Sequence, residues 1–189
     1  MKYATTLLDN SADPINQKFK QLIAKNDIEQ VRAYIASGVN LNTADGKRVS
    51  PIHYAAFAGN LEILRMMIQK GANIRAEVFG GWSALHYAAF GAHPEACNLL
   101  VGMGIPIDVT DIGGETPLFY AIESGSLKTT QWFIANGANV THANNKKETP
   151  LSIASQEVLP DIVALIEESI QKRAEKKQAD GHGQAQHKH

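Results

Sequence analysis

Two histidine–tyrosine pairs are the residues of this chain whose types and spacing first suggest chemistry. His53 and Tyr54 lie in the stretch SPIHYAAFAG, and His86 and Tyr87 lie in the similar stretch SALHYAAFGA. A histidine beside a phenol is a candidate general base, and a pair of histidines is a candidate metal site. Either role needs a further acid, nucleophile or ligand within reach, and the sequence places none beside the pairs.

A structural role explains the same histidines better. Two later segments of the chain resemble these stretches but carry Phe119 and Ser152 at the histidine position. Equivalent positions on neighbouring packed helices lie about 8–10 Å apart, so parallel imidazoles do not converge on one zinc ion, which binds nitrogen at about 2.0–2.1 Å. We therefore predict that His53 and His86 lie in the first turns of helices and hydrogen-bond the backbone of a neighbouring loop.

The other reactive side chains form no recognisable site. Cys97 follows the pattern of a small buried residue beside an apolar run, and His187 and His189 belong to a polar tail without fixed geometry. The basic cluster of segment 172–177 is interleaved with Glu167, Glu168 and Glu175, which favours a solvated helix face. Phosphate-loop, HExxH and serine-elbow motifs are absent from the sequence. We therefore predict a protein that is not an enzyme and that uses no cofactor and no metal.

Composition and charge exclude several classes of protein. The chain has 189 residues, of which 44% are hydrophobic, and a net charge of -1, so it has no basic field for nucleic acid. Its single cysteine excludes an internal disulfide, and no apolar run approaches the roughly 18–20 residues of a membrane span. The N-terminus is a poor secretory signal. We expect a cytoplasmic protein, with export without a cleaved signal as an open alternative.

A period of 33 residues organises the chain. Hydroxyl residues begin four similar segments at Ser50, Ser83, Thr116 and Thr149. Glycines with the same spacing stand at Gly38, Gly71, Gly104 and Gly137. Ser or Thr followed by Pro favours a helix start, and Gly favours a helix end. The pattern predicts units of two short helices and a loop, which must stack because one unit cannot bury its own apolar face.

These features together resemble the ankyrin repeat. The family's unit has two antiparallel helices and a hairpin loop, and its signature Thr-Pro-Leu-His-x-Ala reads here as SPIHYA, SALHYA, TPLFYA and TPLSIA. The loop motif Asp-x-x-Gly-x-Thr is complete from Asp111 to Thr116, whereas Arg48 replaces its Gly in one loop and Val78 replaces its Asp in another. The resemblance implies an all-α solenoid of stacked helix-turn-helix units with hairpin-like loops and capping units at both ends. We expect a monomer.

The repeat landmarks give the expected boundaries of the units. The first unit lacks the Thr-Pro start, and the last has Val158 in place of the mid-repeat Gly before a long charged segment. We predict an N-terminal extension at 1–12, an N-capping repeat at 13–42, ankyrin repeats at 43–76, 77–110 and 111–143, a C-capping repeat with an extended helix at 144–178, and a disordered histidine-containing tail at 179–189.

The resemblance also implies where a partner would bind. In this family, partner contacts lie in the loop before the Thr-Pro start and at the end of the first helix. The candidate residues here are, in the loops, Lys47, Arg48, Val49, Phe79, Trp82, Ile112 and Glu115, and, at the helix ends, Phe57, Phe90 and Glu123. Aromatic anchors flanked by charges are the composition of a binding hot spot. A second interpretation has Phe79 and Trp82 folding back to shield the stack; two aromatics in one Gly-rich loop favour partner contact.

The expected function is non-enzymatic binding of a partner protein through the concave face and the loop tips of the stack. Family membership does not identify that partner. One alternative is a dedicated inhibitor, an immunity factor or a bacterial effector-type ankyrin protein that neutralises or redirects one target protein. A further alternative, an enzyme with an unrecognised site, has no nucleophile–base pair or ligand set to support it.

Overall fold

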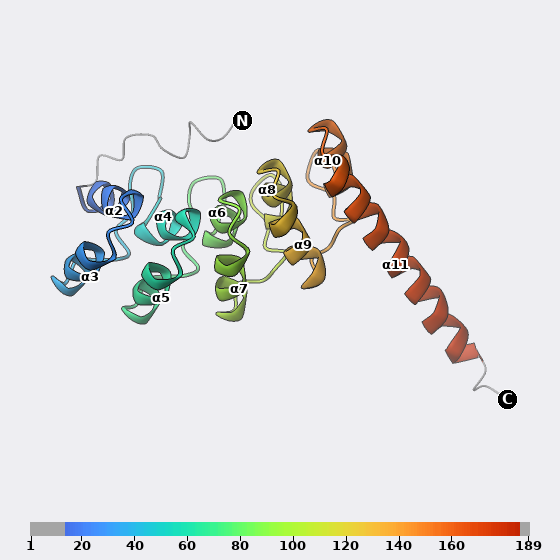
Figure 1. Cartoon of the computed structure of the whole chain (residues 1–189), viewed down its shortest axis with the longest axis horizontal. Helices are drawn as coiled ribbons and strands as arrows, with labels where there is room; N and C mark the ends of the chain where they lie inside the picture. The colour runs from blue at the N-terminus through green and yellow to red at the C-terminus, as the bar shows by residue number, and fades with distance from the viewer. Residues whose placement is uncertain (1–13, 186–189) are drawn as a thin grey trace.

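The computed structural model describes residues 14–185, with side chains for 14–179, as a row of helix pairs (Figure 1). The predicted extension at 1–12 and residues 186–189 of the predicted tail lie outside the described residues. The helices are α2 (Pro14–Ala24), α3 (Ile28–Ala36), α4 (Pro51–Ala58), α5 (Leu61–Gln69), α6 (Ala84–Phe90), α7 (Pro94–Gly102), α8 (Pro117–Glu123), α9 (Leu127–Ala135), α10 (Pro150–Gln156) and α11 (Pro160–Ala185).

The helix pairs stack in two rows. The first helices of the pairs, α2, α4, α6, α8 and α10, contact one another in that order, and the second helices, α3, α5, α7, α9 and α11, do the same. We call these rows the inner and the outer helices. Between residues 14 and 185 the only β-type pairing is one isolated bridge, between Glu77 and Ser83. The predicted all-α repeat fold is confirmed.

Helices begin and end where the two periodic series predict. The N-caps of α4, α6, α8 and α10, all in extended backbone, are Ser50, Ser83, Thr116 and Thr149. Left-handed backbone follows the outer helices, with φ of 83°, 87°, 94° and 93° at Gly38, Gly71, Gly104 and Gly137. A side chain at such a position costs about 1–2 kcal/mol, which explains why glycine recurs there.

Small residues on the inner helices let neighbouring units approach closely. Ala55, Ala56, Ala88 and Ala89 are all completely buried where α4 packs on α6. Larger side chains such as Phe133 of the outer helix α9 are also completely buried. Because each unit buries its apolar side chains against its neighbours, stability depends on the contacts between units as much as on the units themselves.

The first unit closes the stack without a histidine. Phe19 and Leu22 of α2 are buried, and α2 contacts α3 and the inner helix α4 of the next unit. The side-chain amide of Asn16 donates from Nδ2 to the carbonyls of Thr43 at 3.2 Å and of Val49 at 3.1 Å. This amide thereby connects α2 to the loop of the following unit.

The last unit ends in a helix that outruns the stack. Ile162 and Ile166 of α11 are buried, whereas residues 171–179 are exposed. Arg173 donates from Nη1 to the carbonyl of Ala138 at 2.9 Å, which ties α11 to the chain just after α9. The helix reaches Ala185, whereas the sequence predicted a disordered tail from residue 179. Once nucleated, a helix gains one hydrogen bond for each added residue.

Candidate interaction surface

The hairpin loops that precede α4, α6, α8 and α10 form one continuous surface, which we call the loop ribbon (residues 45–49, 78–82, 111–115 and 144–148). Within each loop, the first residue donates its N–H to the carbonyl of the fifth, as Asp111 does to Glu115 at 3.1 Å. Neighbouring loops are joined by backbone hydrogen bonds of 2.9–3.0 Å, namely Phe79 N to Lys47 O, Ile112 N to Gly80 O and Asn145 N to Gly113 O. We call the second residue of each loop the loop tip, and in the last three loops its N–H is fixed by a hydrogen bond to the preceding loop.

The fourth residue of each loop adopts a left-handed conformation. The φ angles are 63° at Arg48, 81° at Gly81, 74° at Gly114 and 67° at Lys147. Two of the four loops thus adopt this conformation without glycine. The departure from the loop motif at Arg48 leaves the turn intact at a cost in backbone strain.

The side chain of the first residue distinguishes the 78–82 loop from the other three loops. The Oδ1 atoms of Asp45, Asp111 and Asn144 accept the N–H of the fifth residue of their own loops at 2.8, 2.8 and 2.9 Å. Val78 has no such acceptor, and its side chain is buried instead. The 78–82 loop is therefore closed by its backbone and by burial rather than by a side-chain acceptor.

Two neighbouring loop tips expose large apolar side chains. Phe79 is 66% exposed and Ile112 is 77% exposed. The tips are adjacent because the N–H of Ile112 bonds to the carbonyl of Gly80. The guanidinium carbon of Arg48 lies 5.9 Å from the centre of the Phe79 ring, within the range of a cation–π contact. These residues make an apolar pair with a positive charge at one side.

Trp82 points the opposite way and belongs to the core. It is only 9% exposed, and its ring lies 4.1 Å from Tyr120 and 6.1 Å from Phe90, measured between centroids. The interpretation that this loop shields the stack therefore holds for Trp82 and not for Phe79. Val49 is buried as well, at 5% exposure. The structure thus offers neither Trp82 nor Val49 to a partner, which corrects their assignment as contact residues.

The helix ends predicted from the family contribute part of the same face. Phe57 at the end of α4 and Phe90 at the end of α6 are half-buried, and their ring centroids are 6.2 Å apart. Phe90 also packs against Tyr120 at 6.5 Å. Both rings are therefore partly exposed to solvent.

Carboxylates gather around the third and fourth loops. The Tyr120 hydroxyl lies 2.6 Å from Asp111 Oδ2 and 3.0 Å from Glu115 Oε2, and Asn144 donates to Glu115 Oε1 at 3.1 Å. Burial, together with these carboxylates, raises the pKa of Tyr120 well above its usual value, so it stays a donor. Burial and the nearby charge of Glu115 raise the pKa of Glu123 to about 7.

The two histidines have the structural role predicted from the sequence. The N–H of Ser50 donates to His53 Nδ1 at 3.1 Å, and His53 Nε2 lies 3.0 Å from the carbonyl of Ala76, in the segment between α5 and α6. His86 likewise accepts the N–H of Ser83 at 3.0 Å, and its Nε2 lies 3.2 Å from the carbonyl of Glu115 in the 111–115 loop. Burial lowers the pKa of both imidazoles to about 4, which keeps them neutral.

The described residues assemble no recognisable chemical centre. Cys97 is buried, and burial raises the pKa of its thiol, which leaves it unreactive. From residue 14 to residue 179, no three histidine, cysteine or acidic side chains come together as metal ligands. Within the part of the chain that the structure describes, every helix is too short or too polar to span a bilayer.

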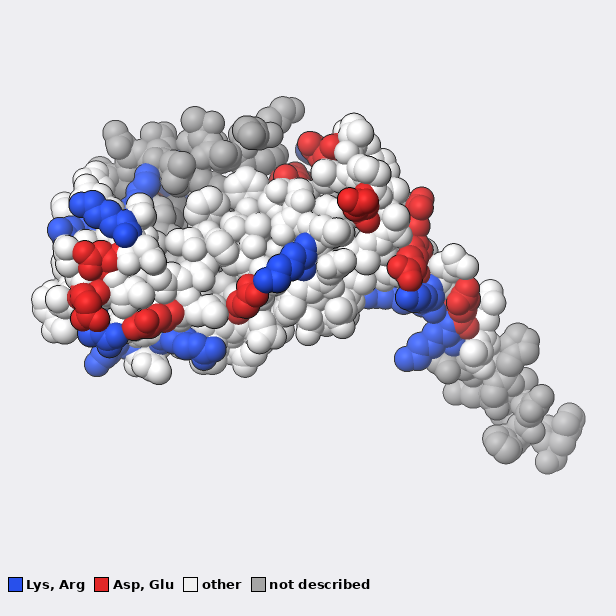
Figure 2. Space-filling model, viewed as in Figure 1, with Lys and Arg blue, Asp and Glu red and all other residues white. Residues whose placement is uncertain are grey.

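Two features of this molecule were not anticipated from the sequence. Tyr120 organises both the aromatic cluster and the carboxylates, and its position one period beyond Tyr87 was the available signal. The second feature is the distribution of charge. On the face seen in Figure 2, charged side chains gather over the first units and over α11, and the surface between them is mostly uncharged.

Comparison with known proteins agrees with the geometry of the stack. A search of curated proteins finds no match. The family model described as ankyrin repeats (3 copies) matches residues 20–111 and 103–177, which together span the stack from α2 into α11. Paired helices, joined hairpin loops and a matching family model over most of its length show that this chain belongs to the ankyrin-repeat family.

Proposed function

We propose that this protein is a non-enzymatic binding module that holds one partner protein on the loop ribbon and the adjoining ends of the inner helices. The observation that carries the proposal is the pair of exposed apolar tips, Phe79 and Ile112, on loops whose backbones are hydrogen-bonded to each other. The half-buried rings of Phe57 and Phe90 extend this surface towards the inner helices.

Rigid support makes the exposed tips suited to binding. An apolar side chain on a mobile loop loses backbone freedom when a partner orders it, and that loss subtracts from affinity. Here the backbone on both sides of Phe79 is already bonded, to Lys47 on one side and through Gly80 to Ile112 on the other. Burial of the tips therefore adds to affinity at little entropic cost.

Charges at the two sides of the surface would orient the partner. Lys47 and Arg48 are exposed beside the first tip, whereas Glu115 and Glu123 lie on the other side of the apolar pair, on α8 and the loop before it. Complementary charges favour one orientation and raise the association rate. We propose a monomer that presents this one face to a protein and not to nucleic acid.

The proposal is tested with a variant that removes only the apolar tips, Phe79→Ser/Ile112→Ser. Both side chains are exposed, so circular dichroism and the melting temperature should stay unchanged. Met103→Ser is the matched control, because Met103 is also an exposed apolar residue, at 45%, but follows the outer helix α7.

Proteins retained from the source cells by wild type and both variants are compared by quantitative mass spectrometry. We expect the tip variant to lose a partner that the Met103→Ser control keeps. Equal retention by all three proteins would show that the tips do not bind.

A further inference from the structure

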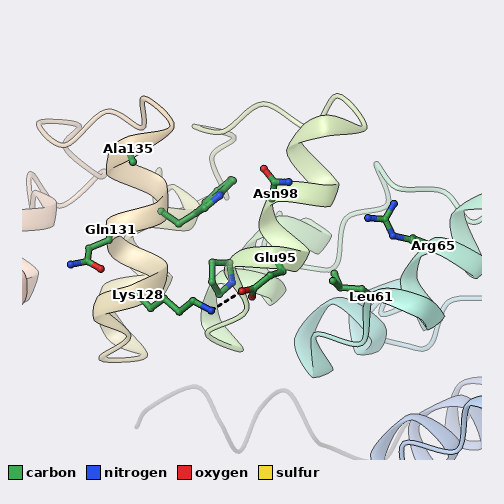
Figure 3. A pocket seen from close by; sticks show the side chains of 9 residues that line it. Leu61, Arg65, Glu95, Asn98, Lys128, Gln131 and Ala135 are labelled. Carbon is green, nitrogen blue, oxygen red and sulfur yellow. Dashed lines mark hydrogen bonds and ion pairs between the residues drawn. The ribbon is translucent and has the colours of Figure 1, made fainter.

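The outer helices carry a separate groove that lies outside the loop ribbon. It has a volume of about 600 Å³ and spans α5, α7 and α9. Figure 3 shows its walls, with Arg65 extending from α5 toward α7 and Lys128 reaching from α9 to Glu95 on α7. The other lining residues are apolar or amide side chains.

The floor of the groove is apolar and fixed in place. Leu61 and Trp132 are half-buried and Pro94 is buried, so they expose limited apolar surface at the bottom of an open groove. The Trp132 ring packs edge-on against the buried Phe133, with centroids 5.0 Å apart and planes at 81°. Its orientation is thereby set before any ligand arrives.

Three polar side chains line the groove at one repeated position. Arg65, Asn98 and Gln131 are spaced by one period and lie on α5, α7 and α9. Each is exposed, and none of the three side chains has a hydrogen bond or ion pair to another residue that the structure describes. They form a row of unused donors across three helices.

The charges of the groove leave one cation uncompensated. Lys128 Nζ lies 2.6 Å from Glu95 Oε1, and this hydrogen bond lowers the pKa of Glu95, so the pair is ionised and internally balanced. Arg65 is the remaining charged lining residue. A ligand that completes the groove should therefore carry a carboxylate near α5.

We propose that this outer groove binds an extended segment of a partner protein that places a carboxylate side chain on Arg65 and an apolar side chain on Trp132. Packed helices lie about 8–10 Å apart, so the row from α5 to α9 extends about 20 Å, the length of about six residues of extended chain. Asn98 and Gln131 would pair with the backbone of that segment, since amides both donate and accept.

The groove and the loop ribbon are separate surfaces, and the inference does not depend on the proposed function of the ribbon. No residue of the groove belongs to residues 45–49, 78–82, 111–115 or 144–148. A segment bound on the outer helices would therefore leave the loop ribbon accessible. The protein would then be able to bind one protein in the groove and another on the ribbon.

The test is selection of a phage-displayed library of random linear peptides on the full chain, with prior depletion on the Arg65→Glu/Trp132→Ala variant. Depletion removes peptides that bind elsewhere, including those on the loop ribbon. A selected peptide is then synthesised and titrated into the Trp82→Phe variant, in which Trp132 is the one remaining tryptophan of the two. Calorimetry on wild type repeats the measurement without the Trp82 change.

We expect selected peptides to share an acidic residue beside an apolar one, to shift Trp132 emission, and to bind Arg65→Glu about tenfold more weakly, a loss of about 1.4 kcal/mol. Lys70→Glu is the matched control, because it makes the same charge reversal at the end of α5 outside the groove. Recovery of no groove-dependent peptide, of peptides without an acidic residue, or of equal affinity for Arg65→Glu would overturn the proposal.

Discussion

The 78–82 and 111–115 loops have the same backbone turn but are stabilised by different chemistry. In the 111–115 loop, Asp111 accepts the N–H of Glu115 at 2.8 Å and the Tyr120 hydroxyl at 2.6 Å. In the 78–82 loop, Val78 is buried and the ring of Trp82 packs on that same tyrosine, with centroids 4.1 Å apart. The 111–115 loop is closed by polar contacts and the 78–82 loop by apolar ones. Tyr120 takes part in both sets of contacts.

This difference shows what the repeat requires of a loop. The requirement is a backbone turn with a left-handed fourth residue, together with hydrogen bonds to the neighbouring loops. An aspartate or a buried valine and tryptophan can each supply the remaining stability. Departures from the family's loop motif are therefore changes in how the turn is held rather than failures of the turn.

The largest expected effect is loss of the apolar closure of the 78–82 loop. Trp82→Ala removes a nearly buried ring and leaves a cavity beside Tyr120, which should lower the free energy of unfolding by about 3–5 kcal/mol. Urea unfolding followed by circular dichroism measures this change. Phe79→Ala in the same loop is the control and should cost less than about 0.5 kcal/mol because its ring is exposed. Similar costs for both would remove the distinction between the two aromatics.

The second effect is the pH dependence of the free energy of unfolding, to which His53 and His86 should contribute equally. Burial lowers the pKa of His53 and of His86 from 6.5 to about 4. Between these values the unfolded chain binds more protons than the folded chain, so stability is full above pH 6.5 and falls as the pH drops towards 4. Each histidine should account for about 3 kcal/mol of that loss.

Urea unfolding of His53→Gln and His86→Gln over this pH range measures the two contributions. Each variant should show a weaker decline in acid than wild type. Glu123 acts in the opposite direction, since its raised pKa of about 7 makes stability fall as pH rises from 4.5 to 7; its partial exposure makes this contribution smaller. If only one histidine variant alters the acid decline, the two imidazoles do not contribute equally to stability.

The third effect is loss of the polar closure of the 111–115 loop. Asp111→Ala removes the acceptor of the Glu115 N–H and of the Tyr120 hydroxyl and should cost about 2 kcal/mol. Val78→Asp makes the complementary change, gaining an acceptor and losing buried apolar surface, and should lie within about 1 kcal/mol of wild type. Thermal unfolding compares the two variants. A larger cost for Val78→Asp than for Asp111→Ala would mean that the two closures are not interchangeable.

The smallest effect concerns the left-handed fourth residue. Lys147 has φ of 67° where the two central loops carry glycine. Lys147→Gly should raise the free energy of unfolding by about 0.5–1 kcal/mol. The strain relieved in the folded state stabilises the protein by more than the added freedom of the unfolded chain destabilises it. Differential scanning calorimetry can resolve this increase. An unchanged or lowered melting temperature would show that this side chain is not strained.

Local features of the sequence predicted most of the fold. Helix starts at Ser50 and Thr116, helix ends at Gly71 and Gly104, and the histidine contacts all depend on residues close in sequence or on the fixed period. The direction of Trp82 was not predictable in this way. It depends on whether space beside Tyr120, nearly forty residues further on, accepts an indole ring.

The candidate surfaces were predicted only in part for the same reason. The loop tips follow from the period, so Phe79 and Ile112 could be named from the sequence alone. The sequence did not predict the outer groove, because the groove is recognised by side chains that have no partner in the described structure. Arg65, Asn98 and Gln131 look like ordinary solvated helix residues until the distances show that no described neighbour pairs with them.

Backbone support of the loop tips separates the display of side chains from the stability of the scaffold. The tips at Gly46, Phe79, Ile112 and Asn145 already range from no side chain to an aromatic ring within one chain. Backbone N–H groups bond Phe79, Ile112 and Asn145 to the preceding loops, and only at Asn145 does the side chain add a hydrogen bond to the loop before it. These four positions are therefore a ready site for engineering, where randomised side chains can be selected for new targets while the rest of the molecule is left untouched.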